Sequence, residues 1–222
     1  MEPNLKKIAA EKAVEWVEDG MTIGLGTGST AYWAILRIAE RVREGLTVRA
    51  AASSIRSEQL AREHGIPLVS LDEIDRFDLT IDGADEADDR LNLIKGGGGA
   101  LLREKVLAAS SDRFVVIVDE SKRVRTLGAF PLPVEIVPFG SRLTLNALKA
   151  LDGNPAVRMD GDRPYVTDNG NWIADCRFGT IDDPEQLSVR LNRIPGVVEN
   201  GLFVGMTSAV VVGTAGGAIV LE

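Results

Sequence analysis

Short apolar runs alternate with amphipathic segments along the first 130 residues of the chain. The apolar runs are typical of buried strands and lie at 22–25, 48–52, 67–71, 77–81 and 114–118. Apolar residues at helical spacing predict helices at 5–17, 31–43, 55–64 and 100–109. Because strands and helices alternate, this part of the chain predicts a parallel, doubly wound, Rossmann-like α/β sheet.

The pattern changes at Phe130-Pro131-Leu132-Pro133, where two closely spaced prolines suggest a domain boundary. Beyond them, strands are expected at 134–137, 156–159, 165–176 and 197–204, and helices at 141–151 and from 184 to the residue before Pro195. The order β-α-β-β-α-β favours a small ferredoxin-like α+β domain. The tail segments 208–213 and 218–221 are typical of strands that return to the main domain. We therefore expect a catalytic domain of residues 1–130 plus 205–222, and a small domain of residues 131–204.

A charged stretch, TIDGADEADDRLNLIKGGGGALLREK at 80–105, follows the predicted strand at 77–81. Asp82 and Asp85 would stand just beyond the carboxyl end of that strand, where open α/β sheets bind ligands. For Asp82, Asp85, Lys95 and Glu104 we favour a functional role, because charge this dense beside a glycine run has no obvious use in folding. A polar loop is the better interpretation for three further acids, Glu86, Asp88 and Asp89.

Four consecutive glycines, Gly96 to Gly99, let a ligand approach the backbone closely. The segment after them is strongly helix-forming, so the glycine N–H groups would lie at a helix start, where anions are favoured. The acids do not fit the spaced calcium-loop pattern, and no His or Cys is near. We therefore expect no dedicated metal.

A second glycine loop occupies residues 24–30, between a predicted strand and a predicted helix. It lacks the Gly-Lys-Ser/Thr ending of a nucleotide P-loop, and its glycines do not have the dinucleotide-binding spacing. The loop suits one phosphate, because Thr27, Gly28, Ser29 and Thr30 offer backbone N–H groups and three hydroxyls at a helix start. The alternative is a capped helix start that binds nothing. Beside the charged stretch, the loop suggests a phosphorylated substrate and an acid–base centre.

Composition and charge limit the binding partners and the cellular location that we expect for the chain. The formal net charge is -8 and the pI is about 4.9, with no basic stripe, so nucleic acid is not expected. No apolar run is long enough to span a bilayer, and the mixed-charge first twenty residues do not predict a signal peptide. The single cysteine, Cys176, suits a reducing cytosol and is expected to be buried. The single histidine, His64, is expected at a helix end, so acid–base chemistry would use carboxylates and lysines.

Several motifs resemble the A type of ribose-5-phosphate isomerase, in that family's order and at its spacings. They are GLGTGST, TIDGADEAD, KGGGGALLREK, DESK at 119–122, FPLPVE at 130–135, VTDNGN at 166–171 and IPGVVENGLF at 194–203. The resemblance covers nearly the whole chain. It implies a Rossmann-like domain with a smaller α+β domain, and a cytoplasmic enzyme of the non-oxidative pentose phosphate pathway that needs no metal or cofactor.

The resemblance also implies residue roles in the conversion of ribose 5-phosphate to ribulose 5-phosphate. Glu104 matches the family's catalytic base, and Lys122 matches a further substrate-binding lysine. The phosphate-side and sugar-side segments match at Thr27, Gly28, Ser29, Thr30, Asp82, Gly83, Ala84, Asp85, Lys95, Gly96, Gly97 and Gly98. The reaction passes through an enediolate, so Lys95 and glycine N–H groups would stabilise the developing charge. Asp82 with Lys95 is our candidate pair for ring opening, and the two aspartates could exchange roles.

Two other functions compete with the isomerase. One is an acyl-coenzyme A transferase with Glu104 as nucleophile, although the chain offers little room for coenzyme A. The other is a non-catalytic sugar-phosphate sensor, although no basic helix-turn-helix precedes Leu25. For the isomerase we expect a homodimer or homotetramer. Val166, Trp172 and Ile173 lie in predicted strands of the small domain, whose open sheet face would need a cover. The alternative is that this face packs against the protein's own large domain.

Overall fold

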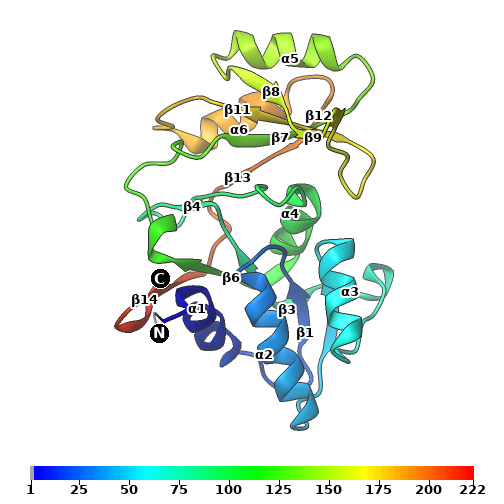
Figure 1. Ribbon diagram of the computed structural model, residues 1–222, viewed down its shortest axis with the longest axis vertical. Helices are drawn as coiled ribbons and strands as arrows, with labels where there is room; N and C mark the ends of the chain where they lie inside the picture. The colour runs from blue at the N-terminus through cyan, green and yellow to red at the C-terminus, as the bar shows by residue number, and fades with distance from the viewer. Residues whose placement is uncertain (1–2) are drawn as a thin grey trace. The chain divides into compact units, whose positions relative to one another are not determined.

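The computed structural model describes residues 3–222 and divides into two compact units (Figure 1). The first unit runs from the start of the described chain to Ala84 and also contains Arg103–Arg123 and Gly205–Glu222. The second unit contains Asp85–Leu102 and Val124–Val204. Within residues 3–222, no helix combines the length and the apolar character needed to cross a bilayer.

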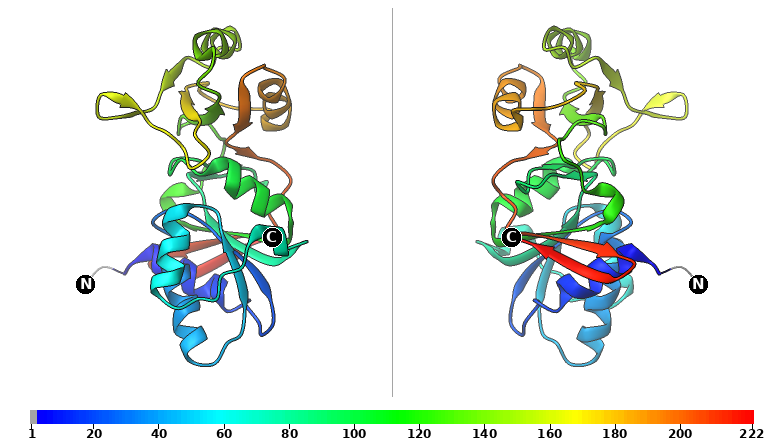
Figure 2. Two further views of the ribbon diagram at one scale, coloured as in Figure 1. Left: turned by 90° about the vertical axis from the view of Figure 1, so that its right-hand side faces the viewer. Right: turned by 90° about the vertical axis from the view of Figure 1, so that its left-hand side faces the viewer.

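A six-stranded sheet in the order β15-β14-β6-β3-β1-β2 forms the centre of the first unit. Its strands are β1 (Thr22–Leu25), β2 (Arg49–Ala52), β3 (Phe77–Gly83), β6 (Ser111–Asp119), β14 (Ala209–Thr214) and β15 (Gly217–Leu221). All neighbours are parallel except β14 and β15, which form an antiparallel hairpin at one edge, in red in Figure 2. The predicted parallel sheet and the return of the tail to the first unit are confirmed.

The helices of the first unit supply its core. They are α1 (Leu5–Val14), α2 (Ala31–Arg43), α3 (Ile55–Glu63) and α4 (Leu101–Ala109), with short 3-10 turns η1 (Leu71–Glu73) and η2 (Glu120–Lys122). Alanines of α1 and aliphatic residues of α2 pack in one buried cluster with β1, β3 and β6. The Asn4 side chain caps α1 by accepting the Lys7 N–H. The expected strand at 67–71 is wrong. Only an isolated bridge joins Leu68 to Ala50, because Pro67 has no N–H to donate and η1 follows.

A four-stranded antiparallel sheet in the order β12-β7-β11-β8 forms the centre of the second unit. Its elements are β7 (Leu132–Ile136), α5 (Ser141–Ala150), β8 (Pro155–Val157), β11 (Trp172–Cys176), α6 (Pro184–Asn192) and β12 (Val197–Asn200). The predicted β-α-β-β-α-β order is therefore confirmed, and with it the ferredoxin-like class. A small hairpin connects β8 to β11 and consists of β9 (Met159–Asp160) and β10 (Arg163–Pro164).

A three-stranded sheet in the order β13-β5-β4 also belongs to the second unit, and the sequence did not predict it as a sheet. Its strands are β4 (Glu86–Ala87), β5 (Leu93–Ile94) and β13 (Leu202–Phe203). Two residues per strand are too few for a periodic signal. Ile94 and Leu202 join the same buried cluster as β7 and β11, so this small sheet contributes to the core of the ferredoxin-like unit.

The second unit is larger than the expected small domain of residues 131–204, because residues 85–102 and 124–130 also belong to it. The Glu86 carboxylate, only 3% exposed, accepts the N–H groups of Gly128 at 2.7 Å and Phe130 at 2.6 Å. The Val124 N–H donates to the Ala87 carbonyl at 2.9 Å. These bonds fix residues 124–130 to β4, so the proline pair marks the start of β7 and not the boundary. Glu86 is thus a buried structural residue and not part of a polar loop.

Candidate active site

The site residues predicted from sequence fall into two groups, one in each unit. The first unit holds Thr27, Gly28, Ser29, Thr30, Asp82, Gly83, Ala84, Glu104 and Lys122. The second unit holds Asp85, Lys95, Gly96, Gly97 and Gly98.

The loop between β1 and α2 is fixed against the end of β3. The Gly26 N–H donates to the Ile81 carbonyl at 2.9 Å, and the Thr27 N–H donates to Asp82 Oδ1 at 2.9 Å. A Cβ atom on Gly26 would lie 2.1 Å from Asp82 Oδ1 and 2.5 Å from Asp82 Cα, so only glycine permits this approach. The loop is therefore held in one conformation before any ligand binds.

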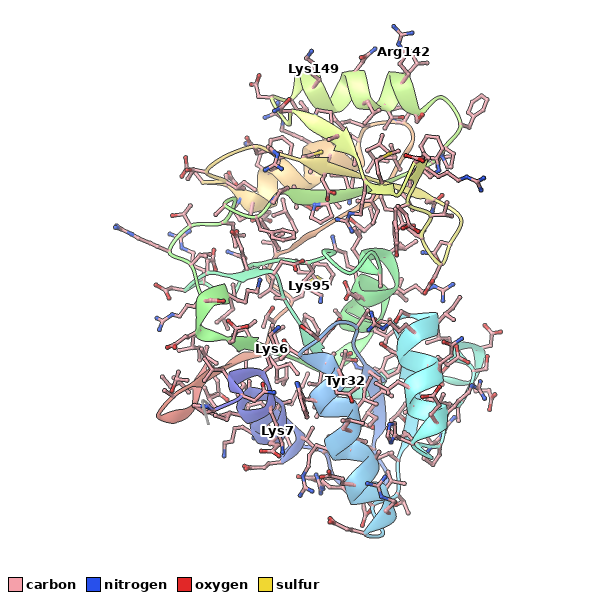
Figure 3. All side chains as sticks on the ribbon, in the orientation of Figure 1. Lys6, Lys7, Tyr32, Lys95, Arg142 and Lys149 are labelled. Atoms are coloured by element: carbon pink, nitrogen blue, oxygen red, sulfur yellow. The ribbon has the colours of Figure 1, made fainter. Side chains whose placement is uncertain are left out.

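The three hydroxyls of this loop are not equivalent. Thr27 Oγ1 lies 2.8 Å from the hydroxyl oxygens of both Ser53 and Ser54, and it therefore anchors the loop to the start of α3. Ser29 is exposed, and its Oγ accepts a hydrogen bond at 2.9 Å from Nζ of Lys6, which is labelled in Figure 3. Thr30 is the N-cap residue of α2 and makes no capping bond with its side chain in the described chain. The hydroxyls of Ser29 and Thr30 and the Lys6 ammonium are thus the groups of this loop region that can contact an anion.

Lys6 is a residue that sequence reasoning missed. It lies in the first turn of α1, where the apolar spacing indicated a helix but gave its charged positions no special meaning. Its cation stands beside a helix N-terminus, and both features favour a negatively charged ligand. The contact with Ser29 joins two segments 23 residues apart, so no local motif could have revealed it.

Two carboxylates of the first unit are buried. Asp82 is 0% exposed at the end of β3, and Glu104 is 4% exposed in the first turn of α4. Asp82 Oδ1 accepts the N–H groups of Thr27 and, at 2.7 Å, of Gly83. Because burying a carboxylate is costly, buried acids of this kind are typical of functional sites.

Lys122 lies in η2, directly after β6, and is partly exposed. Since β1, β3 and β6 are parallel neighbours, the loop at 26–30, Asp82 and Lys122 all lie at the carboxyl ends of these strands, at the same edge of the sheet. This is the edge at which open α/β sheets bind ligands, as the sequence predicted.

The second group surrounds the glycine run. The Asp85 N–H donates to the Ile94 carbonyl at 2.8 Å, and its Oδ2 accepts the Gly97 N–H at 2.7 Å. A Cβ atom on Gly97 would lie 2.5 Å from Asp85 Oδ1, so a side chain would disrupt this contact. Lys95 is 2% exposed, and its Nζ lies 5.4 Å from the ring centroid of Phe203. A cation in this position interacts favourably with the ring face.

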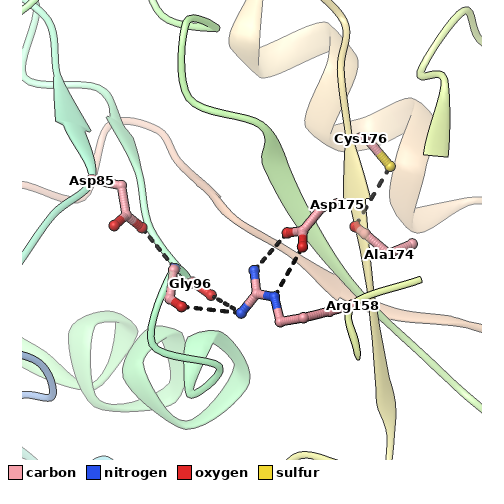
Figure 4. A network of polar contacts seen from close by, with 7 residues as sticks. Asp85, Gly96, Arg158, Ala174, Asp175 and Cys176 are labelled. Atoms are coloured by element: carbon pink, nitrogen blue, oxygen red, sulfur yellow. Dashed lines mark hydrogen bonds and ion pairs between the residues drawn. The ribbon is translucent and has the colours of Figure 1, made fainter. Parts of the chain in front are cut away.

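Arg158 holds the carbonyl side of the glycine run (Figure 4). Its Nη1 donates to the carbonyls of Gly96 at 2.9 Å and Gly97 at 3.1 Å. The other side of the guanidinium meets Asp175, with Nε at 2.9 Å from Oδ2 and Nη2 at 2.5 Å from Oδ1. Sequence reasoning missed both residues, because an arginine and an aspartate in predicted strands give no signal of their own.

Other polar residues singled out in the sequence have structural positions. His64 is the C-cap residue of α3, as predicted. Cys176 is buried, as predicted, and burial raises the pKa of its thiol to about 12. Asp88 Oδ1 accepts the N–H groups of Arg90 and Asn92 in a turn. Among residues 3–222, no three His, Cys, Asp or Glu side chains are grouped so that they could hold a metal ion.

Comparisons with known proteins identify the family. A family model described as ribose 5-phosphate isomerase A (phosphoriboisomerase A) matches residues 49–217. Ribose-5-phosphate isomerase A of Roseobacter denitrificans is 52% identical over 96% of this chain and 85% of its own length. The Bacillus mycoides protein of the same name is 52% identical over 96% of this chain and 97% of its own.

Solved structures agree with the sequence comparison. Ribose 5-phosphate isomerase A of Methanocaldococcus jannaschii superposes with a TM-score of 0.94 at 46% identity, over 98% of both chains. A D-ribose-5-phosphate isomerase in complex with phospho-erythronic acid superposes with a TM-score of 0.96 at 43% identity, over 98% of this chain and 97% of that one. Because sequence and fold both match over nearly the whole length, the chain belongs to the ribose 5-phosphate isomerase A family.

Proposed function

We propose that this chain interconverts D-ribose 5-phosphate and D-ribulose 5-phosphate through an enediolate, without a metal ion or a cofactor. The observation that carries this proposal is the family match at 52% identity over 96% of the chain. The reaction would place the protein in the non-oxidative pentose phosphate pathway. We also propose a cytoplasmic location, since the single cysteine is a free, buried thiol.

In this proposal Glu104 is the base that removes the C2 proton and returns it to C1. Lys95 and the N–H groups of the glycine run stabilise the negative charge on the sugar oxygens. Asp82 works with Lys95 in opening the furanose ring, and Asp85 holds sugar hydroxyls, with an exchange of the two aspartates as the alternative. The bond from Gly97 to Asp85 supports a common role for the carboxylate and the glycine run.

Isomerase assays would test the function directly. Purified protein with ribose 5-phosphate and excess EDTA should form ribulose 5-phosphate at the same rate as protein without EDTA. Loss of turnover with EDTA, restored by a divalent cation, would contradict metal independence. Transfer of an acyl group to coenzyme A would favour the acyl-coenzyme A transferase, and binding without turnover would favour the sugar-phosphate sensor.

The phosphate of the substrate is assigned to the loop of Thr27–Thr30 with Lys6. Its hydroxyls and the Lys6 cation converge at a helix N-terminus, where phosphate is favoured. We expect a double change, Ser29→Ala with Thr30→Val, to raise KM for ribose 5-phosphate about 10–100-fold, because a hydrogen bond to a charged group is worth roughly 1.5–3 kcal/mol. Lys6→Gln should raise the same KM. Steady-state kinetics with ribose 5-phosphate and with free ribose would measure both effects.

Free ribose is the internal control for this prediction, because it lacks the phosphate. Its KM should change much less than that of ribose 5-phosphate in all these variants. Equal losses for both sugars would place the phosphate elsewhere. Lys7→Gln is a matched control for Lys6→Gln, since Lys7 is exposed and its ammonium lies 5.8 Å from the ring centroid of Trp33.

We further propose that the protein is a homo-oligomer with an interface on the second unit. Ile173 is 0% exposed, and Trp172 packs against the buried cluster that contains Ala174 and Cys176, so these two residues do not form the exposed surface expected from sequence. Large apolar side chains are instead exposed around the start of α5, with Phe139 at 92% and Leu143 at 75%. Apolar side chains exposed this close together are typical of interaction sites.

Light scattering coupled to size exclusion would test assembly. We expect at least twice the 23.8 kDa chain mass at micromolar concentration. A double change, Phe139→Asp with Leu143→Asp, should lower that mass, because it places charges in the apolar patch. Val189→Asp, on the partly exposed helix α6, is the matched control and should leave the mass unchanged. A fully active wild-type protein with the mass of one chain would contradict the proposal.

A further inference from the structure

We propose that Arg158 is a positioning residue that fixes and polarises the glycine run, so that the Gly98 N–H becomes a strong donor to the developing enediolate. The inference rests on the proposed isomerase function and goes beyond it, because Arg158 lies outside the residues that the sequence motifs indicate. All of the contacts that carry it lie within the second unit.

One guanidinium nitrogen joins two successive carbonyls of the glycine run. Arg158 Nη1 lies 2.9 Å from the Gly96 oxygen and 3.1 Å from the Gly97 oxygen. Gly96 has a φ of 108°, in the left-handed region, which allows consecutive carbonyls to turn toward the same donor. An arginine cation between two carbonyls forms charge-assisted hydrogen bonds, which are stronger than neutral ones.

Each carbonyl shares a peptide group with the N–H of the next residue. The Gly96 carbonyl belongs to the peptide whose N–H, on Gly97, donates to Asp85 Oδ2 at 2.7 Å. The Gly97 carbonyl belongs to the peptide whose N–H is on Gly98. Gly98 is exposed, and its N–H donates to no acceptor within residues 3–222. This N–H is therefore available to a ligand, and a cation on the opposite end of its peptide strengthens it as a donor.

The guanidinium is itself held in place. Its Nε and Nη2 donate to the two oxygens of the Asp175 carboxylate, at 2.9 Å and 2.5 Å, and the Arg158 and Asp175 side chains are only 16% and 27% exposed. The Arg158 backbone N–H, between β8 and β9, donates to the Ile173 carbonyl of β11 at 2.7 Å and fixes the residue to that strand. A cation that is fixed before the reaction needs no reorganisation when charge develops on the substrate.

Tyr165 completes the support of the glycine run. Its N–H donates to the Arg158 carbonyl at 2.9 Å, and the guanidinium lies 6.0 Å from its ring centroid. A Cβ atom on Gly99 would lie 2.3 Å from the Tyr165 hydroxyl oxygen, so this side chain packs directly against the last glycine. Arg158 and Tyr165 of the ferredoxin-like unit thus both contact the glycine run. In this proposal the unit contributes to catalysis as well as to assembly.

Arginine suits this position and lysine does not. The guanidinium is a planar fork that can bind a carboxylate with two nitrogens and two carbonyls with a third. A lysine ammonium has three donors on one atom and cannot span Asp175 and both glycine carbonyls. Arg158→Lys should therefore keep the positive charge but lose part of the hydrogen-bond geometry. Its kcat is expected to lie between those of wild type and Arg158→Met.

A kinetic comparison of Arg158→Met, Arg158→Lys and Asp175→Asn tests the inference. We expect Arg158→Met to lower kcat about 10-fold or more, because weakening one oxyanion donor should cost less than the 10²–10³-fold of removing it. Arg158→Lys should recover part of that loss, and Asp175→Asn should show a smaller fall. KM for ribose 5-phosphate should change by less than about threefold, since Gly98 acts on charge that is present mainly in the transition state.

Phospho-erythronic acid provides a second readout. Its carboxylate is planar and carries its charge over two oxygens, as an enediolate does, so its Kd should rise in parallel with the fall in kcat. Arg163→Met, on the exposed strand β10, is the matched control and should leave kcat and Kd unchanged. Melting temperatures of all variants separate these effects from loss of folding.

Three outcomes would overturn the inference. The first is a kcat within twofold of wild type in both Arg158 variants. The second is a raised KM or a lower melting temperature with kcat unchanged, which would assign Arg158 a structural role only. The third concerns the case in which Arg158→Met does not fold. A wild-type kcat in Asp175→Asn would then overturn the inference. Absence of isomerase activity in the wild-type protein would instead contradict the proposed function.

Discussion

Replacing Glu104 by glutamine is expected to lower kcat for ribose 5-phosphate about 10²–10⁴-fold while changing KM by less than about threefold. The amide keeps the shape of the side chain but cannot accept the C2 proton. Glu104 is only 4% exposed, so water has little access to replace it as the base. Steady-state kinetics give kcat and KM, and calorimetric titration of the inactive variant with ribose 5-phosphate measures binding separately.

A matched exchange on an exposed helix face controls for the loss of a charge. Glu40 lies on α2 and forms a surface ion pair with Arg37 at 3.0 Å, so Glu40→Gln should leave kcat unchanged. The melting temperature of the Glu104→Gln protein should confirm that it is folded. Activity within a few-fold of wild type in that folded variant would show that Glu104 is not the catalytic base.

Replacing Lys95 by methionine is expected to lower kcat about 10²–10³-fold, the loss typical of removing one donor to a developing oxyanion. Methionine retains the length and apolar stem of the side chain but has no ammonium. Lys95 is 2% exposed and lies against the ring of Phe203, so its charge acts in a site with little water to screen it. Because the same ammonium is proposed to assist ring opening, KM should also rise.

Lys149→Met is the control for this second prediction. Lys149 lies in the last turn of α5 and is exposed (Figure 3), so its loss should change neither kcat nor KM. The Lys95→Met protein should also bind phospho-erythronic acid more weakly, roughly in proportion to its loss of kcat. Full affinity for that acid, with kcat near the wild-type value, would exclude Lys95 from charge stabilisation.

Much of the fold was predictable because its elements carry strong local signals. The strand at 22–25 and the helix at 31–43 match β1 and α2 to the residue, since glycines end both elements. The ferredoxin-like order was predictable for a similar reason. Turns rich in Gly, Asn and Pro separate its strands, and Asp183-Pro184 marks the start of α6.

The features that escaped prediction depend on contacts between distant segments. Strands β4, β5 and β13 have two residues each and exist because they pair with one another. The start of the second unit depends on Glu86, whose buried carboxylate binds a segment 42 residues away. Lys6 and Arg158 are surface-type residues by sequence, and only the fold brings them to Ser29 and to the glycine run.

Isomerisation of ribose 5-phosphate in D2O with excess EDTA, followed by NMR, tests the central claim most directly. An enediolate formed by a carboxylate base exchanges its proton with solvent during at least part of the turnovers. We therefore predict that ribulose 5-phosphate forms and carries deuterium at C1. With the Glu104→Gln protein, we expect neither ribulose 5-phosphate nor deuterium incorporation. Product that forms at the wild-type rate with no deuterium at C1, and none at C2 of the recovered ribose 5-phosphate, would contradict the account.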